Sequence, residues 1–137
     1  MTITKHFTEA DFAAALAAGD TTVCKHIAGT VSVRVLMERD HDCDIPSPEV
    51  YNAADIAGWE AGEWTFWSLS LSVYIGSHCI DRIAASIGGV DCVDDEYLDA
   101  AHLADLANDL MSQANVPAIV RSFARKVAAA ADAMDAS

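Results

Sequence analysis

The stretch from Glu63 to Ile87, EWTFWSLSLSVYIGSHCIDRIAASI, decides the fold that we expect for this chain of 137 residues. Alternation of residue types with period two is typical of a strand with one buried face. The turn residues Gly76-Ser77-His78 separate two such runs, so the stretch predicts a β-hairpin with strands over 63–75 and about 79–87. One face of the first strand holds Trp67, Leu69, Leu71, Val73 and Ile75, and the other holds Trp64, Phe66, Ser68, Ser70, Ser72 and Tyr74.

Upstream of the hairpin, residues 30–38 alternate in the same way and predict a third strand. Residues 8–18 predict a helix, because Thr8 can cap its start and Gly19 can end it. Residues 39–52 are charged and contain two prolines, so they predict a long exposed loop. Residues 53–61 predict a short helical turn that ends near Gly62.

Downstream of the hairpin, the sequence predicts two helices. The first starts at Asp94-Asp95-Glu96, whose carboxylates favour the positive end of a helix. The second follows the break at Asn115-Val116-Pro117, with Pro117 suited to a first helical turn. We therefore expect one α+β domain over 1–137, in which helices cover one face of a three-stranded antiparallel sheet.

The net charge of −13 is concentrated in the middle of the chain. Residues 1–39 hold four basic and four acidic side chains, residues 40–120 hold fifteen acidic ones and Arg82, and residues 121–137 have a net charge of +1. Residues 40–120 therefore have a net charge of −14. A magnitude of about 2–8 is enough to keep a small domain soluble. The excess favours a basic partner surface, although a solubilising surface remains the alternative.

Composition excludes several classes of protein. The negative charge disfavours binding to nucleic acid and to anionic membranes. A hydrophobic fraction of 53% is too high for an acidic disordered chain. We see neither a run of about 18 uncharged apolar residues nor a secretory signal at the start. We therefore expect a cytoplasmic protein, in the host cytoplasm if a phage encodes it.

Cysteines and histidines offer one candidate metal site. Cys24 and His26, and likewise His41 and Cys43, stand two residues apart, and two cysteines with two histidines are a zinc ligand set. The spacing matches no common zinc module, so we favour coincidence. All four cysteines (Cys24, Cys43, Cys79 and Cys92) are then reduced, and we expect no metal and no cofactor.

The sequence contains no recognisable catalytic motif. The run Asp40-x-Asp42-x-Asp44 resembles the start of a calcium loop, but Ile45 and Tyr51 stand where that loop needs glycine and glutamate. His41, His78 and His102 have no recognisable nucleophile beside them. We therefore expect a protein that is not an enzyme, with no catalytic residues.

Aromatic residues gather around the first strand of the hairpin. Trp64, Phe66 and Tyr74 alternate with serines on one predicted face, and tryptophan and tyrosine are typical anchors of protein interfaces. This face is a candidate surface for a partner or for a homodimer contact.

The runs Trp59-x-x-x-Glu63-Trp64-x-Phe66, Ala84 to Asp91 and Glu96-Tyr97-Leu98 resemble small acidic proteins encoded by phages and prophages. The resemblance covers roughly residues 55–112. Those proteins are largely of unknown function, so the resemblance supplies no reaction and no site. It implies a phage context, and small acidic phage proteins include anti-CRISPR inhibitors and mimics of DNA.

These observations favour an inhibitor that binds a basic, nucleic-acid-binding surface of a host defence complex such as a CRISPR effector. Three alternatives stay open: an immunity protein against a basic nuclease toxin, a small metal-dependent enzyme, and a structural phage protein. The candidate partner-binding residues are Asp40, Asp42, Asp44, Glu49, Asp91, Asp94, Asp95, Glu96, Asp99, Trp64, Phe66 and Tyr74.

Overall fold

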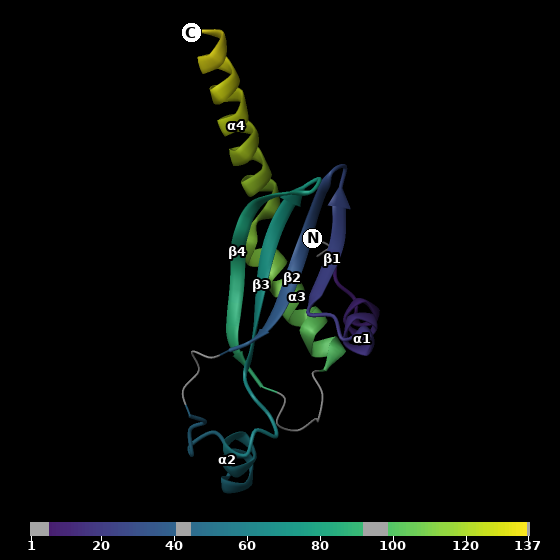
Figure 1. Ribbon diagram of the computed structural model, residues 1–137, viewed down its shortest axis with the longest axis vertical. Helices are drawn as coiled ribbons and strands as arrows, with labels where there is room; N and C mark the ends of the chain where they lie inside the picture. Colours follow the sequence, from purple (N-terminus) through teal and green to yellow (C-terminus); the bar gives the residue numbers. More distant parts are fainter. Residues whose placement is uncertain (1–5, 41–44, 92–98, 137) are drawn as a thin grey trace.

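The chain folds around a single four-stranded antiparallel sheet in strand order β1-β2-β3-β4 (Figure 1). The computed structural model describes residues 6–40, 45–91 and 99–136. The elements follow in the order α1 (Glu9–Ala18), β1 (Thr22–Ala28), β2 (Val31–Arg39), α2 (Ala53–Glu60), β3 (Trp67–Ile75), β4 (His78–Val90), α3 (Ala100–Ala114) and α4 (Val116–Asp135). The α+β class is confirmed.

The predicted hairpin is confirmed, but its first strand begins at Trp67 and not at Glu63. β3 and β4 pair from Ile75 opposite His78 onward, and Gly76 adopts a left-handed φ of 57° in the turn between them. The pairing of β2 with β3 ends where Arg39 lies opposite Trp67. Trp64 and Phe66 therefore lie outside the sheet, and the expectation of a strand over 63–75 was wrong at its start.

The expectation of three strands was also wrong, because β1 is a fourth strand at the edge of the sheet. Its inward positions are Val23, Lys25 and Ile27, and Val23 is 6% exposed. Lys25 interrupts the apolar side of β1, so the sequence pattern does not predict this strand. In the structure, Lys25 Nζ lies 2.9 Å from Asp11 Oδ2 of α1, which gives the charge a partner at the border of the core.

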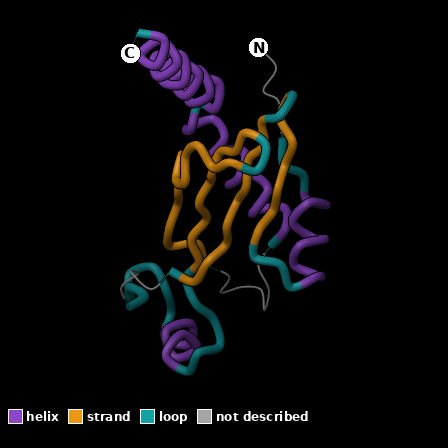
Figure 2. The backbone as a smooth tube through the Cα atoms, turned by 45° about the horizontal axis from the view of Figure 1, so that its top comes forward, coloured by secondary structure: helices purple, strands orange, loops and turns teal. Residues whose placement is uncertain are grey.

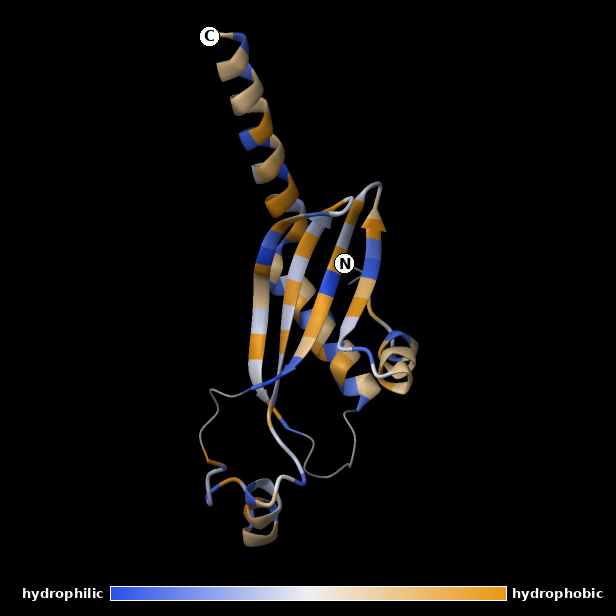
Figure 3. Ribbon diagram, in the orientation of Figure 1, coloured by the Kyte–Doolittle hydropathy of each residue, from blue (hydrophilic) through white to orange (hydrophobic). Residues whose placement is uncertain are grey.

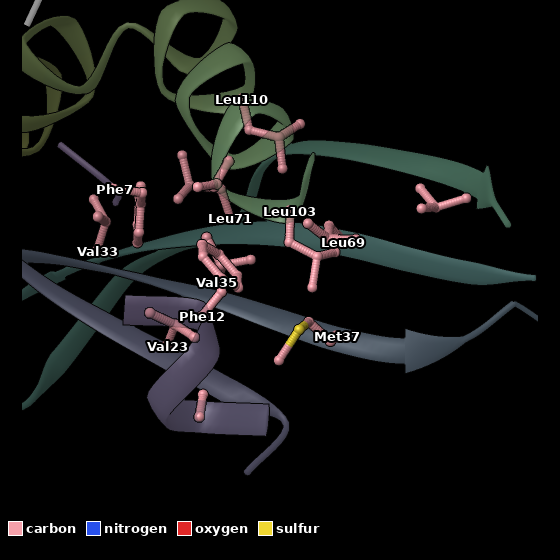
Figure 4. Close-up of a cluster of buried hydrophobic side chains, with 14 of the residues drawn as sticks. Phe7, Phe12, Val23, Val33, Val35, Met37, Leu69, Leu71, Leu103 and Leu110 are labelled. Carbon is pink, nitrogen blue, oxygen red and sulfur yellow. The ribbon is translucent and has the colours of Figure 1, made fainter. Parts of the chain in front are cut away.

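One face of the sheet packs on helices and forms the core. α1 and α3 lie on this face, and Leu103 and Leu110 of α3 point toward the strands (Figure 4). The inward residues of β3 alternate with polar ones, and those of β2 do so except at the outward Leu36 (Figure 3). The side chains with at most 2% exposure are Phe7, Phe12, Val33, Val35, Met37, Leu69, Leu71, Val73, Leu103, Ala107 and Leu110.

Local signals set the helix ends. Thr8 and Asp11 form a capping box at the start of α1, and Gly19 ends it with a φ of 76°. Asn115, at a φ of 51°, ends α3 and also caps α4, whose first turn contains Pro117 as expected. α3 begins after its cap Asp99, and the carboxylates predicted for a helix start at Asp94, Asp95 and Glu96 lie outside the described residues.

Truncation of Leu103 tests the core. Leu103→Ala removes a side chain that is 1% exposed, and we expect it to lower the free energy of unfolding by about 2–5 kcal/mol. Asp105→Ala, on the exposed side of the same helix, should change it by no more than about 0.5 kcal/mol. Urea denaturation of both variants measures the difference, and equal effects would contradict this packing.

The contact between α1 and β1 predicts a pH dependence. Burial raises the pKa of the Asp11 carboxyl, but hydrogen bonds from Lys25 and Thr8 outweigh burial, so its pKa lies below the ordinary value. A lowered pKa stabilises the fold above the unfolded pKa of about 3.9 and loses this contribution as pH falls through the folded pKa.

Asp11→Asn should therefore cost up to about 1 kcal/mol at pH 7, because the side chains of the pair are partly exposed. The cost should shrink toward pH 2, as the wild-type carboxyl becomes protonated as well. Denaturation at both pH values measures it, and a cost that is the same at both would rule out the ion pair as its origin.

Candidate protein-binding surface

One end of the sheet carries a separate lobe of the chain. The last residue of β2, the first of β3 and the last of β4 lie side by side as Arg39, Trp67 and Val90. Residues 45–66, which include α2, extend beyond this end (Figure 1). Figure 2 shows the same lobe below the sheet and the far part of α4 at the opposite end.

An aromatic cluster holds the lobe together. Tyr51, Trp64 and Phe66 have ring centroids 5.1–6.0 Å apart, and Phe66 is only 7% exposed. Trp64 Nε1 donates a hydrogen bond of 2.8 Å to the backbone oxygen of Asp55, which ties the cluster to α2. Gly58 is buried, and a Cβ there would lie 3.3 Å from Trp64 Cδ1, so α2 packs closely on the indole.

Two hydrogen bonds fasten the lobe to the end of the sheet, and a third joins the ends of β2 and β4 beside it. The backbone N–H of Asp40 donates to the oxygen of Phe66 at 2.9 Å. The Asp40 carboxylate accepts from the N–H of Gly89 at 2.8 Å, and Tyr51 donates its hydroxyl to the carboxylate of Asp91. Asp40 and Asp91, both predicted as partner-binding residues, therefore also hold the lobe in place.

All three tryptophans line one cavity at this junction. It has a volume of about 320 Å³ and is lined by Arg39, Trp59, Gly62, Glu63, Trp64, Thr65 and Trp67. The sequence shows that the tryptophans lie within nine residues, but the expected strand placed Trp64 and Trp67 on opposite faces of a sheet. The turn that follows α2 brings them together instead.

The expected shared face of Trp64, Phe66 and Tyr74 was wrong. Tyr74 lies opposite Ser32, near the other end of β3 from Trp67. The guanidinium of Arg34 lies 3.9 Å from the centroid of its ring, which is a cation–π contact on the face of the sheet away from the helices. The three aromatic residues therefore belong to two separate surfaces.

Carboxylates surround the lobe and the adjoining end of the sheet. Of the predicted acidic residues, Asp40, Glu49, Asp91 and Asp99 are described, whereas Asp42, Asp44, Asp94, Asp95 and Glu96 lie outside the described residues. Sequence reasoning missed the contributions of α2 and of the β2 end. We call the described set the acidic end: Glu38, Asp40, Glu49, Asp55, Glu60, Glu63, Asp91 and Asp99.

The candidate zinc ligands are only half described. Cys24 and His26 are exposed on β1, and His26 Nε2 lies 2.8 Å from the oxygen of Gly29. His41 and Cys43 lie outside the described residues. Within the described ranges, no three His, Cys, Asp or Glu side chains are grouped so that they could hold a metal ion.

Comparison with other proteins gives no relative: neither a family model nor a curated protein nor a solved structure matches this chain. In the described part of the chain, none of the helices is both long enough and apolar enough to cross a membrane. The function of this surface can therefore be inferred only from its own residues and geometry.

A double-mutant cycle tests the contact between β4 and Asp40 at the end of β2. A Cβ on Gly88 would lie 2.5 Å from Asp40 Oδ2, so Gly88→Ala must displace the carboxylate that accepts from Gly89. We expect Gly88→Ala to lower the free energy of unfolding by about 0.5–1.5 kcal/mol, because water can replace the exposed hydrogen bond in part. In an Asp40→Ala background the same change should cost little, because the obstructing carboxylate is gone.

Denaturant unfolding of the four proteins gives the coupling energy. Additive effects of the two substitutions would contradict a contact between Gly88 and Asp40.

Proposed function

We propose that the protein is an inhibitor whose acidic end binds a basic, nucleic-acid-binding surface of a host defence complex such as a CRISPR effector, and so blocks DNA binding or cleavage. The support is the concentration of carboxylates at one end of an elongated molecule. Within the described residues, the acidic end holds eight carboxylates and a single cation, Arg39. Effector complexes hold nucleic-acid backbones in positively charged channels, which carboxylates in place of phosphates can occupy.

The tryptophan-lined cavity adds a second kind of contact. Trp59, Trp64 and Trp67 line it together with the carboxylate side chain of Glu63. Charge pairs mainly raise the association rate and select the partner, whereas buried aromatic anchors carry much of the affinity. A surface that combines the two suits a protein partner better than it suits a small ion.

The aromatic cluster also gives this surface a fixed shape. The lobe is tied to the end of β2 by the Asp40 N–H, which donates to Phe66, and Tyr51 ties it to Asp91 just after β4, so its carboxylates are presented by an ordered backbone. A surface that is already ordered loses less conformational entropy on binding. An immunity protein against a basic nuclease would use the same surface and the same physics, and it is the second candidate.

Charge reversal at the acidic end tests the proposal. We expect Glu49→Lys/Glu60→Lys to weaken inhibition of DNA binding by a purified effector complex by about tenfold or more. The matched control is Asp105→Lys/Asp109→Lys on exposed positions of α3. Both double variants change the net charge from −13 to −9, so only a local role of the acidic end separates them.

The assay is a titration of DNA binding in the presence of each variant, repeated at several salt concentrations. Inhibition should weaken as salt rises, because exposed charge pairs are screened. Equal loss in the two double variants would show that bulk charge alone acts. Absence of any effect of the wild-type chain on CRISPR effectors, with inhibition of a nuclease toxin in the same assay, would favour the immunity protein instead.

A further inference from the structure

A groove lies at the end of the sheet opposite the acidic end. It has a volume of about 780 Å³, which is within the range of about 300–1,000 Å³ for small-molecule sites. Ile27 and Val31 of one wall lie where β1 turns into β2, whereas the acidic end begins at Arg39 and Trp67. The other wall comes from the last turns of α3 and the first turns of α4. The groove takes no part in the proposed function.

Apolar side chains form most of the surface of the groove. Ile27, Val31, Met111 and Val120 pack against the hydrophobic core but are only half-buried, and Val116 is 4% exposed. In the described part of the chain, the outer surfaces of the half-buried side chains therefore remain exposed along the groove. Covering such surface is favourable by the hydrophobic effect, so the groove suits a ligand with an apolar body.

Three of the polar side chains that line the groove already have partners within the chain. The Asn108 side chain accepts from the N–H of Phe7 at 3.0 Å and donates to the oxygen of Phe7 at 2.9 Å. Ser112 donates its hydroxyl to the backbone oxygen of Asn108 at 3.3 Å, and the Asn115 side chain caps α4. Because these groups bind the protein's own backbone, they offer little hydrogen bonding to a ligand.

Arg121 gives the groove a positive charge. It is exposed on α4, and in the described part of the chain it forms neither an ion pair nor a hydrogen bond. No carboxylate stands among the described residues that line the groove, although the whole chain has 21 acidic and only 8 basic side chains. His6 lines the groove as well and can donate a ring N–H. The groove therefore presents an unpaired cation beside an apolar surface.

We propose that this groove binds a single-chain amphiphile of the fatty-acid type, with an apolar chain and one carboxylate. The apolar chain lies against Ile27, Val31 and Met111, and the carboxylate pairs with Arg121. A guanidinium can donate two parallel hydrogen bonds to a carboxylate. A neutral amphiphile would leave the cation of the groove without a partner, and a cationic one would be repelled by it.

Local charge and overall charge favour opposite ligands at this groove. The net charge of −13 attracts organic cations and repels carboxylates at long range. Residues 116–126, by contrast, contain Arg121, Arg125 and Lys126 and no acidic side chain. A preference of the groove for a carboxylate over an ammonium group can therefore come only from the residues around it. This preference is the property that the experiment has to measure.

Titration of the full-length chain with three probes tests the proposal: decanoate, decanol and decyltrimethylammonium, each kept below the concentration at which it forms micelles. The probes share one apolar chain and differ in the head group. Backbone amide NMR signals from the groove residues report both the place and the affinity of binding. We expect decanoate to bind there about threefold to fivefold more tightly than decanol, because a partly exposed ion pair adds modestly to affinity. Decyltrimethylammonium should bind there more weakly than both.

Two matched variants test the role of Arg121. Arg121→Gln should abolish the preference for decanoate over decanol, because it removes the cation that the carboxylate pairs with. Arg125→Gln removes the same charge one turn further along α4, outside the lining of the groove, and should keep the preference. Both variants change the net charge from −13 to −14, so only the position of the lost charge separates them.

A third variant tests the groove itself. Ala28 lines the groove, is exposed and lies opposite Val31, so the indole of Ala28→Trp should fill the space of the ligand. We expect it to weaken binding of decanoate and of decanol by about tenfold or more, since such a site covers most of its ligand. Circular dichroism shows whether each variant keeps the fold, which we expect because all three positions are exposed.

Several outcomes would overturn the proposal. Decanol or decyltrimethylammonium could bind at the groove as tightly as decanoate, or Arg121→Gln could retain the preference for decanoate. If a second copy or another segment of the chain fills the groove, none of the probes will shift its signals, and that result contradicts the proposal as well. Each outcome is independent of whether the acidic end inhibits an effector complex.

Discussion

Nine consecutive residue pairs join β2 to β3, and the other elements take their places from this register. Within it, Val33, Val35, Leu69, Leu71 and Val73 share one face and have no exposed surface. A shift of one residue would turn all of them toward water. The buried face is therefore what holds the register, and α1 and α3 pack on it because it is the large apolar surface that the sheet offers.

The same register determines where the two ends of the molecule differ. Pairing stops at Arg39 and Trp67, so the chain leaves the sheet there and builds the lobe with α2. At the other end, α4 begins after the left-handed turn at Asn115 and continues past the strands. Carboxylates gather at the first end, and the cations of α4 lie at the second. The proposed binding surface and the projecting part of α4 are thus separated by the length of the sheet.

The candidate surface combines residues that the sequence identifies with long-range contacts that only the structure reveals. The acidity of the middle of the chain and the closeness of the three tryptophans are visible without a structure. That Asp40 accepts from Gly89 across 49 residues, and that Tyr51 reaches Asp91, are not. Such pairs depend on how the ends of three strands align, and no local pattern encodes that alignment. The edge strand β1 was missed because Lys25 interrupts its apolar side, and only the nearby Asp11 explains the lysine.

The sequence by itself determined the hairpin of β3 and β4, the strand β2, the start of α1 and the break between α3 and α4. Period-two alternation, capping side chains and turn residues act over a few neighbours, so they survive without tertiary context. Only the tertiary structure decided that Trp64 and Phe66 leave the sheet, that the tryptophans share a cavity and that α4 projects with an exposed apolar stripe. These features depend on where the pairing of two strands ends and on how far a helix extends past the sheet on which it packs. Both depend on the relative lengths of elements that are distant in the sequence, so no local pattern encodes them.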